Sequence, residues 1–519
     1  MKITNLMVGI MLTYTLGSCS YLDVEPTDFI SPSTYFTKEI EAERALNGVY
    51  QNMTSRFLYG RNLVVEMDLF CNDLCVQSSS SSIGVPFFDF TPSDPVLSGV
   101  WQSCYEGINR ANIFLENVDR VPMDSVLKLR RTGEARFLRA LYYYHLVQNW
   151  GAVPLKLVST KNPNDVHIAT SPAEQIFEQI ETDLKFAEEV LPLPSEMLST
   201  ERSGRASKTA AQALLARVYL RSAGWPFYIN KGYQQAATYA KKVINSGEHK
   251  LNPDYKEVFM NLIQDKYDRT FNEIIFEVEF FGNGKQDIYT AFGNFHSYTV
   301  PYRRDGNQVT WGLTTYNTTK YFNLFEVTDV RRDWNISPHN FKNSNFEEGH
   351  VPAGSTKRYI GKFYREYETY LPQYTNNSPI NFPLIRYAEV LLVLAEAEVK
   401  AMNQVTDSAM WALNEIRMRS SASMFDKNMD PSLSDPENFI AKIQDERARE
   451  LFFEAHRRQD LIRWGILVPV MKALSTDANY LSTNPTVINR VNEKFMLLPY
   501  PEREMSSNNL MKGKQNIGW

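Results

Sequence analysis

The stretch EARFLRALYYYHLVQNWGAVPL, which runs from Glu134 to Leu155, decides the fold. Its apolar and aromatic side chains recur three and four residues apart, and this spacing places them on one stripe of a helix. Gly151, followed by Pro154, is a typical helix stop. The pattern extends upstream, so we predict a long helix from Leu127 to Trp150 that packs between neighbours. Its charged side chains can form ion pairs along or across helices, namely Glu134, Arg136 and Arg139.

Helical patterns of the same kind recur before and after this helix, often in pairs about 30 to 45 residues apart, which is the range of helical repeats. The pairing indicates tetratricopeptide-like helix–turn–helix units, although the consensus residues of that repeat are poorly matched. We therefore predict a mostly α fold in which helix pairs form one α-helical body with a loop-rich insertion. Besides 127–150, the predicted helices are 38–56, 101–120, two that start after Ser171 and at Ser207, 233–245, 384–402, 407–420 and 435–474, the last with a break near Gly465.

The chain changes character between about residues 251 and 383. Helical periodicity fades there, Gly, Asn, Thr and Pro are interspersed with aromatic residues, and only Glu273 to Phe281 alternates like a strand. We predict a loop-rich insertion that packs on the helices and forms a ligand-binding face. The mature body then comprises a helical layer (37–250 and 384–474), this insertion (251–383) and a C-terminal segment that wraps around the body (475–519).

The first 18 residues have the pattern of a bacterial lipoprotein signal peptide. A short apolar run from Leu6 to Leu16 leads into Leu16-Gly17-Ser18-Cys19, which matches the lipobox. We predict that Cys19 is acylated and becomes the mature N-terminus, with residues 19–36 as a tether; a secretory signal cleaved elsewhere is the alternative. Two or three acyl chains hold a protein on a membrane almost permanently, because each buried methylene contributes about 0.8 kcal/mol. No later stretch reaches 18 uninterrupted apolar residues, so we expect lipid to be the only anchor.

The composition is that of an ordinary folded protein with a high content of aromatic residues. Of the 519 residues, 43% are hydrophobic and 22% are charged, and the formal net charge is -5. This balance gives no general attraction for nucleic acid or anionic lipid, so we expect no nucleic-acid partner. The 28 Tyr, 30 Phe and 8 Trp provide more ring surface than a helical core usually needs.

Three cysteines remain in the mature chain after Cys19, namely Cys71, Cys75 and Cys104. A protein beyond the inner membrane can form a disulfide, so one bond among the three is an option. The spacing lacks the histidines of a zinc site. We favour buried free thiols over the disulfide.

The sequence contains no pattern for catalysis, a metal ion or a cofactor. The seven histidines are scattered, with no two within a helical turn of each other. A nucleotide-binding glycine loop and a Gly-x-Ser-x-Gly nucleophile elbow are also missing from the sequence. Carboxylate pairs for glycoside hydrolysis have a spatial and not a sequential spacing, so they leave no pattern. We expect no catalytic residue, no metal site and no cofactor.

One group of carboxylates nevertheless invites a catalytic interpretation. Glu446, Glu450 and Glu454 lie four residues apart and so share one helix face. We interpret this stripe as a salt-bridged face packed on a neighbouring helix. The basic residues within pairing reach are Arg449, Arg457 and Arg458.

Aromatic residues in loops are the strongest candidates for a binding site. Oligosaccharides present apolar C–H faces and many hydroxyls, so their sites combine aromatic rings with polar side chains that form hydrogen bonds. The segment from Phe292 to Trp311 has this mixture, and the Ser-, Gly- and Pro-rich stretch 77–99 reads as a surface loop with rings of its own. The candidate ligand residues are Trp311, Tyr298, Phe295, Tyr302, Asn307 and Arg303 in the insertion, and Phe87 and Phe88 in the earlier loop.

Four segments together resemble the SusD/RagB family of outer-membrane nutrient-binding lipoproteins. They occur in the family's order and span essentially the whole mature chain, and the closing Leu498-Pro499-Tyr500-Pro501 fits as well. Two positions depart from the family: Ala455 replaces a usual glycine, and His145 replaces a usual polar or acidic residue. The segments are Cys19 to Pro26, Glu134 to Tyr144 continuing to Leu155, Pro383 to Leu392 continuing to Ala397, and Glu446 to Leu451 continuing through His456 to Gly465.

The resemblance implies that the protein binds a glycan on the outside of the outer membrane. It further implies delivery of that glycan to a SusC-like TonB-dependent transporter, on which the helical layer docks like a lid. Family members generally build their sites from Trp and Tyr in the region of Trp311. The alternatives are capture of a peptide, as in RagB-type members, a surface glycosidase, and a transporter plug without ligand affinity of its own.

Overall fold

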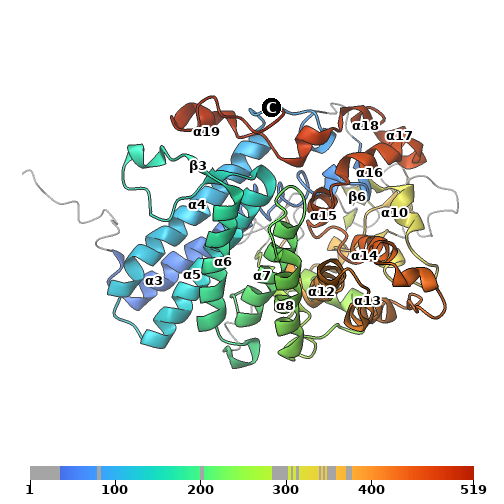
Figure 1. The fold of residues 1–519 in the computed structure, drawn as a ribbon, viewed down its shortest axis with the longest axis horizontal. Helices are drawn as coiled ribbons and strands as arrows, with labels where there is room; N and C mark the ends of the chain where they lie inside the picture. The colour runs from blue at the N-terminus through green and yellow to red at the C-terminus, as the bar shows by residue number, and fades with distance from the viewer. Residues whose placement is uncertain are drawn as a thin grey trace, which may run out of the picture.

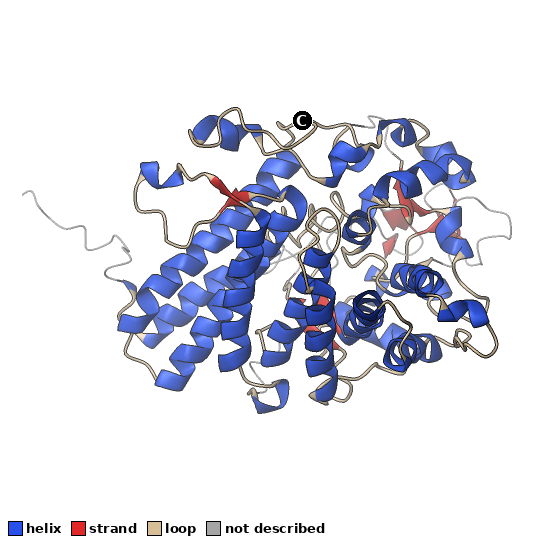
Figure 2. Ribbon diagram, in the orientation of Figure 1, coloured by secondary structure: helices blue, strands red, loops and turns tan. Residues whose placement is uncertain are grey.

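Helices make up most of the protein, which confirms the predicted fold class (Figures 1 and 2). The computed structural model describes residues 35–78, 83–198, 204–282, 315–337, 358–369 and 377–519, together with the backbone of four short strands between residues 302 and 347. In this part of the chain, no helix combines the length and the apolar character that crossing a bilayer requires.

The first half of the chain folds into a row of helices (Figure 1). These helices are α3 (Glu39–Gln51), α4 (Pro95–Asn117), α5 (Ser125–Trp150), α6 (Ala173–Val190), α7 (Lys208–Ala223) and α8 (Gly232–Asn245). Each helix packs against the next one along the chain, and α3 also contacts α5. Helices that follow one another in sequence are thus neighbours in space, as the prediction of helix–turn–helix pairs requires.

After the insertion, the chain returns to the same row. Helix α12 (Tyr387–Met402) packs against both α7 and α8, and it then contacts α13 (Asp407–Arg419) and α14 (Pro436–Glu450). The predicted helix from 384 begins later than expected, because residues 384–386 belong to a strand. The shorter helices are α9 (Tyr255–Ile263), α10 (Thr319–Asn323), α11 (Arg332–Asn335), α15 (Arg457–Arg463), α16 (Leu467–Ala473), α17 (Ala478–Thr483), α18 (Val487–Arg490) and α19 (Glu502–Ser507).

Both ends of α5 follow from its sequence. The carboxylate of Asp124 accepts a hydrogen bond from the Leu127 amide at 2.8 Å and so caps the N-terminus. Gly151 follows the last helical residue with a φ of +74°, a conformation that favours glycine. Nearly the whole C-terminal half of the helix is buried, including Tyr142 and Tyr143. The predicted helix from Leu127 to Trp150 is therefore confirmed, with its start two residues earlier.

The charged residues of α5 fix it between its neighbours. Two of the three predicted pairing residues form ion pairs along the helix or with neighbouring segments, and both are buried. Arg136 instead lies over the ring of Phe186 in α6, with 4.0 Å between its guanidinium carbon and the ring centroid. The ion pairs are Arg139–Asp183 at 2.7 Å, Glu134–Arg131 at 2.7 Å and Glu134–Arg205 at 2.8 Å.

The insertion contains more regular structure than we predicted. Residues 255–263 form α9, with apolar side chains buried against the body. The predicted strand is β4 (Ile274–Val278), but it is buried on both faces and pairs with β11 (Phe382–Arg386), so its burial does not alternate. The other strands are β1 (Cys75–Gln77), β2 (Val153–Pro154), β3 (Thr170–Ser171), β5 (Tyr302–Arg304), β6 (Gln308–Thr310), β7 (Thr315–Asn317), β8 (Asn340–Lys342), β9 (Asn345–Glu347) and β10 (Arg358–Tyr359).

Helices α14 and α15 are separated by a break that the sequence pattern did not predict. The predicted break at Gly465 is present, with φ of +73°, but the chain also leaves the helix after Glu450. Phe453 and Ala455 have φ of +62° and +59°, which is unfavourable for a residue with a Cβ atom. Ala455 stands where SusD/RagB sequences usually have glycine, and this conformation explains that preference.

The C-terminal segment lies along the end of α5, at the top of Figure 1. The Leu498 amide donates to the Asn149 carbonyl at 2.8 Å, and Trp150 Nε1 donates to the Pro499 carbonyl at 2.8 Å. Asn516 Nδ2 donates to the Trp150 carbonyl at 2.9 Å. Carbonyls at a helix C-terminus have no partner within the helix, so this distant segment supplies the missing hydrogen bonds.

The three cysteines of the body are buried free thiols, as favoured from the sequence. The thiol of Cys75 donates to the Leu69 carbonyl at 2.8 Å, and that of Cys71 donates to the Glu66 carbonyl at 3.1 Å. Burial raises the pKa of Cys71 to about 12, so its unreactive thiol form predominates at neutral pH.

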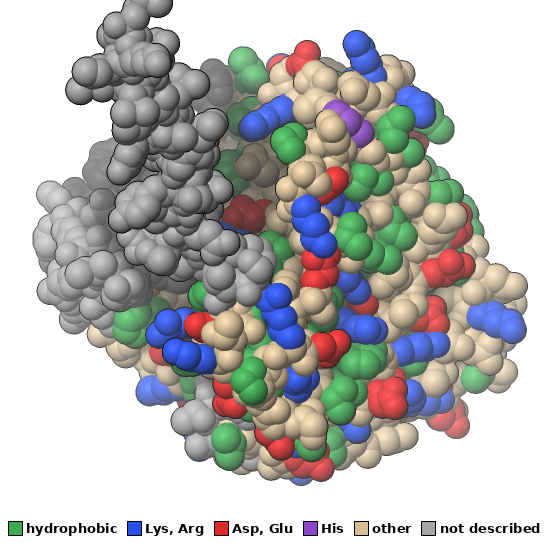
Figure 3. Space-filling view, turned by 90° about the vertical axis from the view of Figure 1, so that its left-hand side faces the viewer, with side chains coloured by type: hydrophobic (Ala, Val, Ile, Leu, Met, Phe, Trp, Pro, Cys, Tyr) green, Lys and Arg blue, Asp and Glu red, His purple; other side chains and the backbone are tan. Residues whose placement is uncertain are grey.

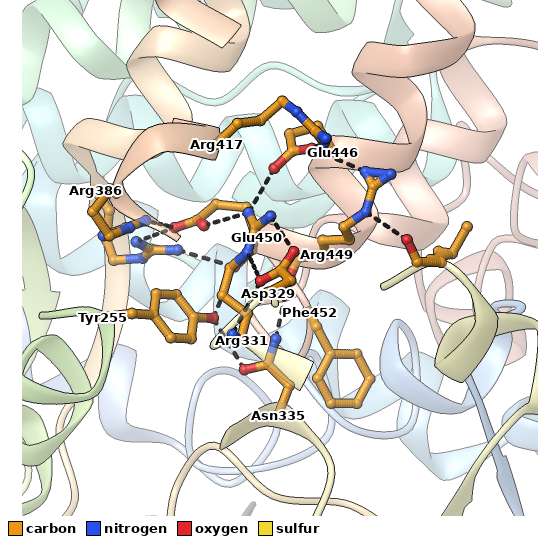
Figure 4. Close-up of polar contacts among 12 residues, drawn as sticks. Tyr255, Asp329, Arg331, Asn335, Arg386, Arg417, Glu446, Arg449, Glu450 and Phe452 are labelled. Atoms are coloured by element: carbon orange, nitrogen blue, oxygen red, sulfur yellow. Dashed lines mark hydrogen bonds and ion pairs between the residues drawn. The ribbon is translucent and has the colours of Figure 1, made fainter. Parts of the chain in front are cut away.

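Buried ion pairs connect the insertion to the helices that follow it (Figure 4). The carboxylate of Glu450 accepts hydrogen bonds from Arg419 Nη2 at 2.6 Å, Arg386 Nη1 at 3.0 Å and Arg331 Nη1 at 3.1 Å. These arginines lie at the end of α13, at the end of β11 and directly before α11. One side chain of α14 thereby joins three segments that are far apart in sequence.

The neighbouring carboxylates of the stripe are paired in the same way. Glu446 contacts Arg331 at 2.6 Å and Arg417 at 2.8 Å, and Glu454 contacts Arg386 at 2.6 Å. The three carboxylates are salt-bridged as predicted, but Glu454 lies beyond the end of α14, so they do not share one helix face. Only one predicted partner belongs to this cluster. Arg449 pairs with Glu446 at 2.9 Å, whereas Arg457 pairs with Asp73 at 2.8 Å and Arg458 donates to Asn149 Oδ1 at 3.1 Å.

The charges of this cluster are fully buried and depend on one another. Burial by itself raises the pKa of Glu450, but Arg419, Arg386 and Arg331 outweigh it and hold the pKa well below its usual range. In Glu446, burial is likewise outweighed by arginines, led by Arg331, and the pKa falls to about 2. Because these pKa values lie below those of the unfolded chain, the carboxylates stabilise the fold at neutral pH. This contribution is lost as the pH falls from about 4.5 towards 2.

Glu450→Gln should lower the free energy of unfolding by about 3 kcal/mol, because losing one partner leaves buried charges uncompensated. The thermal midpoint should fall, while the affinity for ligand should change little. Glu437→Gln, in the first turn of the same helix, is the matched control. Glu437 pairs with Lys400 at 3.0 Å but is largely exposed, and exposed pairs contribute about 0–1 kcal/mol. Thermal and urea denaturation followed by circular dichroism measure both effects. A Glu450→Gln variant as stable as the parent, with tenfold weaker ligand binding, would contradict the structural role.

Candidate ligand-binding face

A small sheet fixes the ends of the loops that carry the predicted ligand residues. Strand β7 lies at its centre and pairs antiparallel with β1 and with β10. Gln77, at the end of β1, faces Thr315, at the start of β7. Because the strands are antiparallel, the chain that follows Gln77 and the chain that precedes Thr315 lie at the same edge of the sheet. The beginning of the first predicted aromatic loop and the end of the second therefore lie side by side.

A second sheet contains the two strands that directly precede β7 in the chain. Its strand order is β5-β6-β9-β8, and β5 and β6 form a hairpin in which Tyr302 faces Thr310. Gln308 faces Asn345, so the hairpin of β8 and β9 lies beside that of β5 and β6. The segment 311–314 connects β6 to β7 and thus joins the two sheets.

The structure places some of the predicted ligand residues and not others. Tyr302 and Arg303 lie in β5, where the backbone is described. The remaining candidates of the insertion lie outside the described residues, and so does the predicted lipidation site. These are Trp311, Tyr298, Phe295, Asn307 and Cys19.

Phe87 and Phe88 are buried, so the prediction that they lie in a surface loop is wrong. Each side chain is only 4% exposed. The ring of Phe88 contacts that of Phe495 at 5.3 Å between centroids, and Phe90 contacts both Phe495 and Trp519. The C-terminal segment covers these rings, a contact that the local sequence does not reveal. Neither Phe87 nor Phe88 offers a ligand an accessible ring.

Two tyrosines that the sequence analysis did not single out belong to an aromatic cluster in the insertion. Trp334 contacts Tyr364 at 4.7 Å and lies nearly parallel to Tyr367 at 6.3 Å between centroids. Tyr367 is 41% exposed, whereas the other two rings are buried. Trp334 therefore supports a ring that a ligand can reach. The sequence 363–374 has the same mixture of aromatic and polar residues as 292–311. This composition could have identified the two tyrosines as candidate ligand residues.

A cavity of about 180 Å³ lies between α9, β4 and the connection of α6 to α7. Tyr267 lines it, is 40% exposed, and donates to Glu279 Oε1 at 2.6 Å. Burial, followed by the charges of Glu279 and Asp265, raises the pKa of Glu277 well above its ordinary value. A protonated carboxyl and a tyrosine can bind hydroxyl groups, so this cavity is a second candidate site.

A smaller cavity of about 50 Å³ lies inside the body, between α5, α7 and α15. His145 and His456 line it. Burial, then the charge of Arg217, lowers the pKa of His145 to about 3, and burial lowers that of His456 to about 4. Both rings are therefore neutral at physiological pH. The space holds only a few water molecules, so we interpret this cavity as part of the core.

The described residues contain no candidate metal site, and the Glu446 and Glu450 stripe is not suited to acid–base chemistry. Among them, no group of three or more His, Cys, Asp or Glu could hold a metal ion. The carboxylates of Glu446 and Glu450 are occupied by arginines and lie at 0% exposure. A general acid or base has to reach the substrate, which these side chains cannot do.

The face on the side of α3 carries charges of both signs, interspersed with apolar side chains (Figure 3). Interspersed charges cancel at a distance, so the described part of this face does not produce the strong positive potential that nucleic-acid binding needs.

Comparison with protein families identifies the fold. The model of the SusD family matches residues 272–519, and a model described as "Starch-binding associating with outer membrane" matches residues 20–220. The chain belongs to the SusD-like family. The two matches lie on either side of α8 and α9 and together include most of the mature chain, which confirms the resemblance predicted from the four segments.

Curated relatives of the SusD-like family align over most of the chain. A SusD-like protein of Formosa agariphila is 25% identical over 554 aligned residues, which cover 98% of this chain and 97% of that protein. The starch-binding protein SusD of Bacteroides thetaiotaomicron is 24% identical over 455 residues, which cover 76% of each chain.

Solved structures of the SusD-like family superpose over nearly the whole chain. A SusD homologue from Bacteroides thetaiotaomicron has a TM-score of 0.82 at 25% identity, and the match covers 94% of this chain and 98% of that one. A laminarin-binding SusD-like protein has a TM-score of 0.73 at 24% identity, with 93% and 100% coverage. At that identity, the second likeness shows the fold alone.

Phe88→Ala should lower the free energy of unfolding by about 3–5 kcal/mol, because it leaves a cavity beside Phe495. The ligand affinity of the folded fraction of this variant should be unchanged, so any weaker binding should reflect only the smaller amount of folded protein. Ile83→Ala is the control, since Ile83 lies in the same loop but is 66% exposed. Urea denaturation measures the stability of both variants. A stable Phe88→Ala variant with weaker ligand binding would return this residue to the ligand site.

Proposed function

We propose that this SusD-like protein binds an oligosaccharide at the cell surface and delivers it to a SusC-like TonB-dependent transporter in the outer membrane. Family membership supports the binding of a carbohydrate, since a relative and one of the two matching family models are described as starch-binding. The aromatic and polar composition of the insertion supports the same ligand class, because sugars stack on rings and form hydrogen bonds through their hydroxyls.

The pairing of Gln77 with Thr315 is the observation that carries the proposal. It anchors the end of β1 and the segment after Trp311 at one edge of a sheet that is fixed to the body. A loop with both ends on rigid elements can present rings at low entropic cost, which strengthens binding. We propose Trp311, Tyr298, Phe295, Tyr302, Arg303 and Asn307 as the ligand-contacting residues, with Tyr367 as an addition from the structure.

Two features support an outer-membrane location. Cys19 ends a lipobox, and residues 20–220 match a family described as associating with the outer membrane. We propose that acylated Cys19 holds the mature chain on the membrane, with the body facing the cell exterior. The helical row is the surface proposed to dock on the transporter.

Capture of a peptide, as in RagB-type members, is the second candidate, because tyrosine and tryptophan also bind peptides well. Calorimetric titration of the mature chain with a panel of oligosaccharides and a panel of peptides separates the two. Heat of binding from a sugar alone supports the proposal, and heat from peptides alone overturns it. Release of products from a polysaccharide by the pure protein would instead show a glycosidase.

Trp311→Ala should weaken binding of the cognate glycan at least tenfold, because losing one stacked ring costs about 1–3 kcal/mol. The circular dichroism spectrum and thermal midpoint should stay unchanged. Trp411→Ala, which removes an exposed tryptophan from α13, is the control and should leave glycan affinity unchanged. A large drop in midpoint for Trp311→Ala would mean that the ring is part of the core. Unchanged glycan affinity in a well-folded Trp311→Ala variant would mean that Trp311 does not contact the ligand. In that case Tyr367→Ala tests the next candidate ring.

Cys19→Ala should release the protein from membranes without unfolding it, provided that the leader can still be removed. The acyl chains are the proposed anchor, and without them nothing else in the proposal holds the chain on lipid. The fraction in the membrane pellet, measured in cells without the partner transporter, reports the effect. Complete retention of the variant would show that the anchor lies elsewhere.

A further inference from the structure

The outward face of α13 carries an apolar groove that is separate from the ligand-binding face. Trp411 and Met418 lie on it, with 42% and 56% of their surface exposed. Met424, which follows the helix, is 62% exposed and lines the same groove. The opposite face of α13 is buried against α12, and α13 lies at the lower edge of the molecule in Figure 1. Large apolar side chains that gather on a surface mark binding sites.

The wall of the groove is held rigidly. Asn414 Nδ2 donates to the Phe425 carbonyl at 2.8 Å, and the Phe425 amide donates to Asn414 Oδ1 at 2.8 Å. Arg417 Nε donates to the Ser423 carbonyl at 2.5 Å. Both neighbours of Met424 are thus tied to α13, so the groove exists before any partner arrives. A preformed groove lowers the entropic cost of binding.

The charges at the rim of the groove are acidic. Asp407 and Glu415 line it, and no lysine or arginine does so among the described residues. Asp407 forms a long ion pair with Lys427 at 3.8 Å, and the Lys427 ammonium also donates to the Val405 carbonyl at 2.8 Å. Glu415 has no ion pair among the described residues, so the lining keeps a net negative charge. Asp407 and Glu415 are eight residues apart, which is about 12 Å along the helix. A partner that matches this surface needs an apolar stripe with basic groups about two helical turns apart.

We propose that the α13 groove, formed by Asp407, Met410, Trp411, Glu415, Met418 and Met424, binds a basic amphipathic helix of a partner protein. The apolar stripe of that helix lies on Trp411 and the methionines, and its Lys or Arg side chains face Asp407 and Glu415. This is the helix-in-groove mode of recognition, which depends on apolar anchors at helical spacing.

The side chains of the groove favour a protein helix over other occupants. Methionine side chains are flexible and polarizable, so they adapt to the varied apolar side chains of a protein partner. Anionic lipid headgroups would be repelled by the two carboxylates.

A designed peptide tests the proposal directly. The probe is a fluorescein-labelled, 18-residue helical peptide of leucine and lysine with one apolar stripe, and its counterpart replaces each lysine by glutamate. The leucine/lysine peptide should bind the mature chain, and its affinity should fall as the salt concentration rises, because exposed charges are screened.

Trp411→Ala and Met424→Ser should each lower the affinity for this peptide, Trp411→Ala by about tenfold or more. The double variant Asp407→Asn/Glu415→Gln should bind more weakly and lose most of the salt dependence.

Leu198→Ser is the matched control, because Leu198 is 68% exposed and lies outside the groove. It should leave peptide affinity unchanged, and none of the groove variants should change glycan affinity. Equal binding of both peptides, or parental affinity in Trp411→Ala and Met424→Ser, would overturn the proposal. Self-association of the parent that Trp411→Ala abolishes would also overturn it, since the occupant would then be a second copy of this chain.

Discussion

The pairing of Glu450 with Arg331, Arg386 and Arg419 is the interaction on which the rest of the structure depends. A buried charge without a partner costs several kcal/mol, so these side chains fold together or not at all. They come from the residue directly before α11, from β11, from α13 and from α14. Together they fix the loop-bearing insertion on the helical row and give the ligand loops a rigid base.

The protein presents two surfaces with different chemistry. The edge formed by Gln77 and Thr315 holds segments rich in aromatic and hydrogen-bonding residues, as a hydroxyl-rich ligand requires. The outward face of α13 combines Trp411 and methionines with carboxylates, as a basic protein helix requires. The two proposed binding surfaces therefore use different residues.

Local patterns predicted most of the helices, because helix formation depends on residues three and four positions apart. They failed where tertiary contacts override local preference. Residues 384–386 read as helix but pair with β4, and α14 ends after Glu450 because the chain turns through Phe453 and Ala455. Phe87 and Phe88 have the composition of a surface loop around them, yet both are buried, and Phe88 packs on Phe495 of the C-terminal segment.

The sequence by itself determined the mostly helical fold, the family and the ion pairing of Glu446, Glu450 and Glu454, and the proposed lipid anchor at Cys19 rests on the sequence alone. Periodicity, motif spacing and charge pairing along a helix are local properties, which the order of residues fully specifies. Only the tertiary structure decided which arginines meet Glu450, which aromatic rings are buried and why Trp411 lies on the surface. Those outcomes depend on segments that are not neighbours in the sequence; the arginines of Glu450, for example, lie 31 to 119 residues away from it. Burial and ion pairing are settled only when such segments come together.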